Sequence, residues 1–211
     1  MSGLVLIMSL AACGDGAASQ GPEPTAAQRP AVPDGWTTLT TPEGDVRLTV
    51  PPDIDLINAA PGSLAAQPPM RDGVVPFEVI VEAPGAELGP PRAGESVFDY
   101  LRDRGWLPSA DQGLTFGSVV ERETMLPAGR AFEVRMSVQP GTPEEGRVAI
   151  YLIETQAGVA LLRFVGTPAG MELRTGQIDL MSRLIEFGIQ VRPRSPHQSD
   201  DSSRPASSTR P

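Results

Sequence analysis

Residues 131–165 read AFEVRMSVQPGTPEEGRVAIYLIETQAGVALLRFV and carry the clearest structural pattern in the chain. Over 131–138, apolar side chains alternate with charged or hydroxyl ones, which predicts a strand with one buried and one wet face. The runs 147–154 and 159–165 are apolar on both faces and are expected near the centre of a sheet. The separators PGTPEEG and TQAG are too short for parallel crossovers, so these strands are expected to pair antiparallel.

Further strand and helix signals extend outward from this segment. Ser96 followed three residues later by Asp99 predicts the start of a helix, and Gly105 suits its end. An amphipathic pattern over 176–187 predicts a closing helix, with Asp179 and Arg183 paired on its outside. Additional strands are expected at 36–41, 46–50, 77–81 and 114–122.

These signals together predict one α+β domain over residues 35–191. Its expected form is an antiparallel β-sheet of about six strands with helices packed against it. The segment 51–76 begins with two prolines and is rich in Pro, Ala and Gly, so it is expected to be a loop between strands.

Several of these segments together resemble the PsbP-like fold group. They are the opening tryptophan with a strand, turn and strand that ends in proline, the mid-chain helix, the LPAGRAFEVRM strand, and the LLRFVGTP strand that leads to the last helix. The resemblance covers roughly residues 35–190 and, within the group, points to LpqN-type lipoproteins of actinobacteria. It implies an accessory or interaction module without a known catalytic centre, so no catalytic residues carry over.

The only cysteine, Cys13, ends a short apolar run at residues 4–12. That run suits the apolar region of a signal peptide and is too short to span a bilayer as a helix. Leu10-Ala11-Ala12-Cys13 resembles the bacterial lipobox, which implies cleavage after a signal peptide of residues 1–12 and lipidation of the cysteine. We therefore expect a lipid anchor, palmitate among its acyl chains, on the extracytoplasmic face of the cell membrane. The segment MSG at the start carries no basic residue, a departure from ordinary export signals.

Both ends of the chain have the composition of segments without a core. Residues 13–34 contain the lipidated cysteine and a Gly-, Pro- and Ala-rich stretch, which is expected to be a flexible linker. Residues 192–211 are rich in Ser, Pro, Arg and Asp and are expected to be a disordered tail. The formal net charge of the whole chain is −9, which argues against nucleic acid as a partner.

The residue inventory excludes most catalytic schemes. The only histidine, His197, lies in the predicted tail, and the chain has no lysine, so neither a histidine-based triad nor a P-loop can be built in the domain. The carboxylate pairs of the motifs PPDIDL and PEEG lack the further ligands of a calcium loop. We therefore expect no metal, no cofactor and no enzymatic activity.

Trp36 and Trp106 are the candidate contact residues, because each stands at the edge of a predicted element where an indole can anchor a partner or line a groove. They can equally fill the ends of a core that is short of aromatic residues, and Tyr151 on a central strand is expected to be core. Two functions stay open. The first is a non-enzymatic envelope module that binds another envelope protein. The second is a binding protein for a small apolar ligand or lipid, held in a pocket between sheet and helices.

Overall fold

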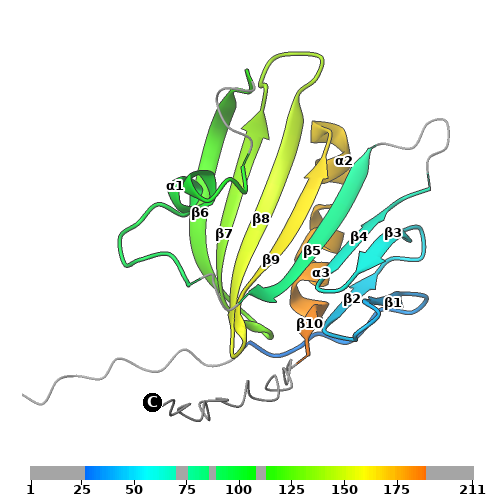
Figure 1. Ribbon diagram of the computed structural model, residues 1–211. Helices are drawn as coiled ribbons and strands as arrows, with labels where there is room; N and C mark the ends of the chain where they lie inside the picture. The colour runs from blue at the N-terminus through cyan, green and yellow to red at the C-terminus, as the bar shows by residue number, and fades with distance from the viewer. Residues whose placement is uncertain (1–26, 70–75, 86–88, 108–112, 189–211) are drawn as a thin grey trace, which may run out of the picture.

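The computed structural model describes residues 27–69, 76–85, 89–107 and 113–188. These residues form a seven-stranded antiparallel sheet, a small three-stranded sheet, and helices on both faces of the larger sheet (Figure 1). The order of the larger sheet is β3-β4-β5-β9-β8-β7-β6. Its strands are β3 (Asp55–Ala60), β4 (Ser63–Gln67), β5 (Phe77–Gly85), β6 (Phe116–Leu126), β7 (Gly129–Val138), β8 (Gly146–Thr155) and β9 (Gly158–Gly166).

The predicted antiparallel meander is confirmed over β6, β7, β8 and β9. Strand β9 lies at the centre of the sheet between β5 and β8, and β8 is its neighbour. Leu152 and Leu162 on these two strands have no exposed surface. Their runs are apolar on both faces because a core lies on each side of the sheet.

The larger sheet contains five of the expected strands and, in addition, the hairpin β3–β4, which lies within residues 51–76 where the sequence pattern predicts a loop. The strands expected at 36–41 and 46–50 belong instead to the small sheet. Pro61 and Gly62 form the turn of the β3–β4 hairpin, and Gly62 has φ +74°, as the third residue of a type II turn does. Leu64 and Ala66 of β4 are fully buried. Alanine and proline are poor strand formers, and this composition hides the hairpin in the sequence.

The mid-chain helix is confirmed as α1 (Val97–Asp103). The Ser96 hydroxyl accepts a hydrogen bond from the Asp99 amide at 3.2 Å, as the capping pattern predicts. Gly105 follows the helix with φ +71°, a conformation that glycine adopts without strain.

The C-terminal segment differs from the single helix predicted over 176–187. It forms α2 (Pro168–Leu173), α3 (Thr175–Leu184) and the short strand β10 (Glu186–Phe187). The backbone leaves the helix at Ile185, and β10 then pairs with β2 (Val46–Val50). Together with β1 (Thr37–Thr40), these strands make the small sheet.

Two separate apolar cores lie on opposite faces of the larger sheet. One core fills the space between this sheet, α3 and β2, and the other lies under α1 (Figure 1). Successive residues of β8 alternate between them, since Tyr151 belongs to the first and Leu152 to the second. Helix α2 contacts β8 and β9, and α3 reaches β7 through Asp179, which contacts Arg135.

Candidate functional site

The face of β7 that the sequence pattern predicts to be wet is instead partly buried. Glu133 is 1% exposed and Ser137 is 5% exposed. Both lie on the side of the sheet that holds Tyr151 and α3. Alternation along a strand shows which side chains share a face but not what covers that face, so the sequence pattern alone misses this burial.

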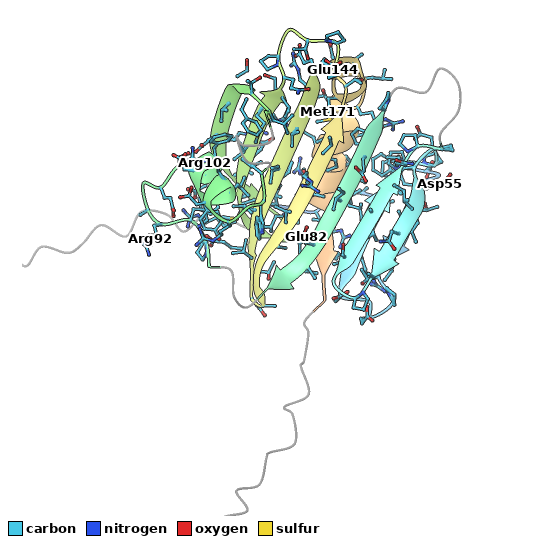
Figure 2. The ribbon with its side chains drawn as sticks, turned by 45° about the horizontal axis from the view of Figure 1, so that its top comes forward. Asp55, Glu82, Arg92, Arg102, Glu144 and Met171 are labelled. Carbon is cyan, nitrogen blue, oxygen red and sulfur yellow. The ribbon has the colours of Figure 1, made fainter. Side chains whose placement is uncertain are left out.

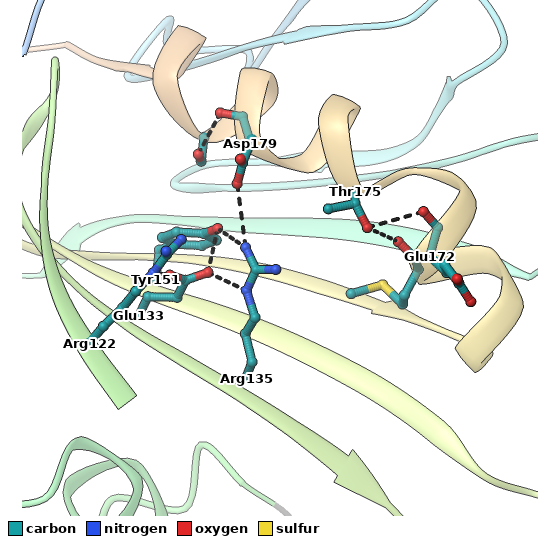
Figure 3. A network of polar contacts seen from close by, with 9 residues as sticks. Arg122, Glu133, Arg135, Tyr151, Glu172, Thr175 and Asp179 are labelled. Atoms are coloured by element: carbon teal, nitrogen blue, oxygen red, sulfur yellow. Dashed lines mark hydrogen bonds and ion pairs between the residues drawn. The ribbon is translucent and has the colours of Figure 1, made fainter. Parts of the chain in front are cut away.

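Glu133 is the centre of a network of ion pairs (Figure 3). Its carboxylate accepts hydrogen bonds from Arg122, from Arg135 Nε at 2.5 Å and from the Tyr151 hydroxyl at 2.8 Å. Arg135 Nη2 lies 3.4 Å from the Tyr151 hydroxyl and 3.4 Å from a carboxylate oxygen of Asp179 on α3. Burial of a carboxylate is tolerated when the charge is paired and its oxygens have donors, and both conditions hold here.

The network fixes the guanidinium of Arg135 from three directions. Two of its three nitrogens contact groups on β7, β8 and α3. The third nitrogen, Nη1, has no hydrogen-bond partner among the described residues, and in Figure 3 it points to the side where Thr175 and Glu172 lie. The Arg135 side chain is 40% exposed.

A cleft of about 510 Å³ lies beside this guanidinium, between β6–β8 and the helices α2 and α3. Figure 2 shows Met171 of α2 and Glu144 of the β7–β8 turn at the same end of the sheet. The cleft lining combines polar and apolar groups, among them Val120, Arg135, Arg147, Met171, Glu172 and Ile178. Such a volume is within the range of small-molecule binding sites.

The charges in the cleft are unevenly placed. Arg135 and Arg147 lie on the sheet side, and Glu172 lies on the helix side. Arg147 is 57% exposed, and its Nε lies 4.0 Å from Glu145, too far for a hydrogen bond. The sheet wall therefore offers N–H donors on two guanidinium groups that the described residues do not use.

The structure places the two tryptophans on different faces of the larger sheet and brings neither to the cleft. Trp36 packs against the core between the sheet and α3, and Trp106 against the core under α1. The ring of Trp106 meets Tyr100 edge-on at 6.5 Å between centroids. Each is partly buried, and Tyr151 is 1% exposed, as expected of a core residue.

The carboxylate pairs of PPDIDL and PEEG form no shared site. Asp53 accepts a hydrogen bond from Arg174 Nη2 at 2.5 Å, and this bond lowers the pKa of the Asp53 carboxyl. Asp55 lies on the edge strand β3 (Figure 2). Glu145 accepts a hydrogen bond from the Gly141 amide within its own turn. In the described ranges no group of three or more His, Cys, Asp or Glu side chains is placed to hold a metal ion.

A second hollow, of about 700 Å³, is lined by residues at the two ends of the described chain, including Ala27, Phe187 and Gly188. Its cation, Arg29, donates to the Leu184 carbonyl at 2.9 Å and pairs with Glu186. Because that cation is already bound, we place the candidate site in the cleft beside Arg135.

Cys13 and His197 lie outside the described residues, as do the predicted signal peptide, most of the predicted linker and the predicted C-terminal tail. Within the described residues, each helix is too short, or insufficiently apolar, to cross a bilayer.

No family model matches the sequence, and no curated protein matches it. Several solved structures are similar in fold. PsbP from the cyanobacterium Synechocystis is 9% identical, with a TM-score of 0.47 over 80% of this chain and 100% of that one. LpqN of Mycobacterium tuberculosis, which is involved in cell envelope biogenesis, is 13% identical, with a TM-score of 0.44 over 72% and 89%. A Pseudomonas aeruginosa protein of unknown function is 14% identical, with a TM-score of 0.42 over 68% and 91%.

At these identities the similarity concerns the fold alone. The strands and helices themselves confirm the α+β class with an antiparallel sheet. Assignment to the LpqN-type lipoproteins is finer than this and stays a prediction.

Proposed function

We propose that this chain is a non-enzymatic envelope lipoprotein that is anchored through Cys13 and binds a small, partly apolar ligand in the cleft beside Arg135. The observation that carries the binding proposal is the cleft itself, about 510 Å³ between β6–β8 and the two C-terminal helices. The lipobox motif supports the anchor. The acidic composition and the apolar wall of the cleft agree with a ligand other than nucleic acid.

The chemistry of the cleft supports binding over catalysis. The nearest buried carboxylate, Glu133, is held by two guanidinium groups and by the Tyr151 hydroxyl. A general base needs a free lone pair within reach of a substrate proton, and Glu133 lies behind Arg135 and not in the cleft. Two hydroxyl groups in the cleft lining, those of Ser137 and Thr175, donate to backbone carbonyls and not to a general base.

A second candidate function is docking of another envelope protein over the same cleft. It is favoured by a large apolar side chain in the cleft lining that solvent reaches, because Val120 of β6 is 59% exposed. A ligand and a docked protein are distinguished by whether the cleft alone, without a partner, takes up a small molecule.

The test is calorimetric titration of the full chain carrying Cys13→Ala, which removes the lipid, with dodecanoate below its micellar concentration. Thr175→Trp places an indole in the cleft from an exposed helix position and should reduce the affinity at least tenfold. Gly176→Trp adds the same side chain at the next position, where the added Cβ would meet no other atom, and should leave the affinity unchanged. Absence of dodecanoate binding, or equal effects of both variants, would contradict the binding proposal.

A further inference from the structure

We propose that the cleft recognises an amphiphile with a single negative charge, a carboxylate or a phosphodiester, held by Arg135 and Arg147 while its apolar chain lies along the helix wall. This inference rests on the proposed function, because it names the chemical class of the ligand that the cleft takes.

Arg135 is prepared for an anion before any ligand arrives. Its Nε and Nη2 are held by Glu133, Tyr151 and Asp179, and these contacts come from three different elements. Its Nη1 keeps its N–H donors free of described partners and lies beside the cleft (Figure 3). A guanidinium whose rotamer is already fixed loses little entropy on binding, so each bond to a ligand oxygen contributes more to affinity.

Arg147 supplies the second cation from the neighbouring strand. In the register of β7 and β8, Arg135 faces Ala149 and Ser137 faces Arg147, so the two arginines are diagonal neighbours on one face. Diagonal neighbours lie roughly 7–8 Å apart at the backbone, within reach of two long side chains that converge on one group. An ionised group with two oxygens can accept from both.

The other charges around the cleft favour a ligand with a single negative charge. Arg122 and Arg135 together balance Glu133 and Asp179. Arg147 forms an ion pair with Glu145 at 4.0 Å, a contact beyond hydrogen-bond distance that leaves the N–H donors of Arg147 for a ligand. Glu172 lies across the cleft and repels a second negative charge on the ligand. A phosphate monoester that carries two charges therefore fits less well than a carboxylate or a phosphodiester.

The cleft also has apolar side chains against which the apolar part of the ligand can pack. Met171 and Ile178 of the helices are largely buried but line the cleft, and Val120 on β6 is 59% exposed beside them. A short acyl chain laid between these side chains removes apolar surface of both molecules from water.

The experiment compares four ligands of matched chain length on the full chain carrying Cys13→Ala. They are dodecanoate, a dodecanoyl lysophosphatidylglycerol, neutral monododecanoylglycerol and cationic dodecyltrimethylammonium. We expect at least one of the two anions to bind about tenfold or more tightly than the neutral ligand, the size of a charged hydrogen bond, and the cation to bind most weakly. Preference for the carboxylate indicates a free fatty acid, and preference for the phosphodiester indicates a lipid headgroup.

Arg135→Gln should abolish the tenfold preference for the anion, and Arg147→Gln should reduce it several-fold. The matched control is Arg130→Gln, which removes a guanidinium from the same strand that pairs with Glu123 and lies outside the cleft lining, and it should preserve the preference within about twofold. Arg147 is largely exposed and engaged in no described hydrogen bond, so its variant keeps the test decisive if Arg135→Gln fails to fold.

Equal affinity for the neutral and anionic ligands in the wild-type chain would overturn the anion inference and leave the proposed function intact. The same holds if Arg130→Gln and Arg135→Gln reduce the preference equally. Failure of all four ligands to bind would remove the proposed function as well.

Discussion

The buried carboxylate of Glu133 links neighbouring strands of the larger sheet through its hydrogen bonds. The carboxylate lies in the middle of β7 with 1% of its surface exposed, and its three donors come from β6, β7 and β8. The network therefore ties three adjacent strands together on the side of the cleft. The sequence places Glu133, Arg135 and Ser137 on one face correctly, but the burial depends on Tyr151 and α3, which lie elsewhere in the chain.

Glu133→Ala should lower the free energy of unfolding by about 3 kcal/mol. This is the lower end of the range for breaking a buried ion pair, because Arg122 and Arg135 are partly exposed and can turn to water. Chemical denaturation followed by circular dichroism measures the change. Glu82→Ala on β5, at an exposed position, should change stability by less than about 0.5 kcal/mol, and an equal loss in both variants would refute the structural role of Glu133.

The Glu121 carboxylate on β6 accepts hydrogen bonds from the start of α1. The free energy of unfolding should therefore depend on pH. Burial raises the pKa of the Glu121 carboxyl, but hydrogen bonds from the Ser96 hydroxyl and the amides of Phe98 and Val97 outweigh it, and the net pKa is lowered. A carboxyl whose pKa is lowered in the folded state stabilises it above the unfolded value, about 4.3, and loses that contribution as the pH falls through the folded pKa.

Glu121→Gln should therefore cost about 1 kcal/mol of unfolding free energy at pH 7. The difference from wild type should shrink as the pH falls below about 4. Denaturation curves at a series of pH values provide the measurement. A difference that stays constant down to pH 2 would show that the charge of Glu121 is not what holds the helix.

At the scale of elements, the hairpins are fixed by glycines whose surroundings differ. Gly129, the first residue of β7 after the β6–β7 turn, has φ +149°, and a Cβ at this position would collide with the carbonyl oxygen of Glu154. Gly141, in the β7–β8 turn, has φ +79° and open space around the position of a Cβ. Substitution of both glycines by alanine therefore compares a steric collision combined with backbone strain, at Gly129, with backbone strain alone, at Gly141.

Gly129→Ala should destabilise the fold by about 3 kcal/mol or more, because it adds a collision with backbone to an unfavourable φ. Gly141→Ala should cost about 1 kcal/mol, from its positive φ alone. Thermal unfolding of both variants gives the comparison, and similar melting temperatures would mean that the β6–β7 turn relaxes around the added carbon.

The elements that the sequence predicts well are those with strong periodicity. The four-stranded meander and α1 follow from alternation and capping residues, and the structure confirms both. The hairpin β3–β4 is missed because its alanines and its turn proline are typical of loops. The split of the last helix is missed because the departure at Ile185 is decided by pairing of β10 with β2, a contact between distant segments.

The candidate site is a property of the whole molecule and could not be located from the sequence. Arg135 and Arg147 become neighbours through strand register, and Met171 and Ile178 reach them from helices later in the chain. The tryptophans attract attention in the sequence because they are rare, yet they pack on separate cores away from the cleft. In the sequence, the signal that points to this site is the set of polar side chains on β7, namely Glu133, Arg135 and Ser137.

Anchoring is also tested at this scale. Wild-type cells fed a labelled palmitate analogue should yield a labelled chain in the membrane fraction, and Cys13→Ala should abolish the label and release the chain. A conservative control is Ala12→Gly, which keeps a small residue before the cysteine and should leave labelling intact. A labelled Cys13→Ala chain would contradict the anchor.

The central claim is that the cleft beside Arg135 holds the apolar part of a small ligand. Methyl NMR of the full Cys13→Ala chain during titration with dodecanoate tests it most directly. The signals of Met171 and Ile178, which line the cleft, should shift in a saturable manner, while those of Ile150 and Leu101, in the core under α1, should stay in place. Saturable shifts in the α1 core, or no shifts at Met171 and Ile178, would contradict the claim.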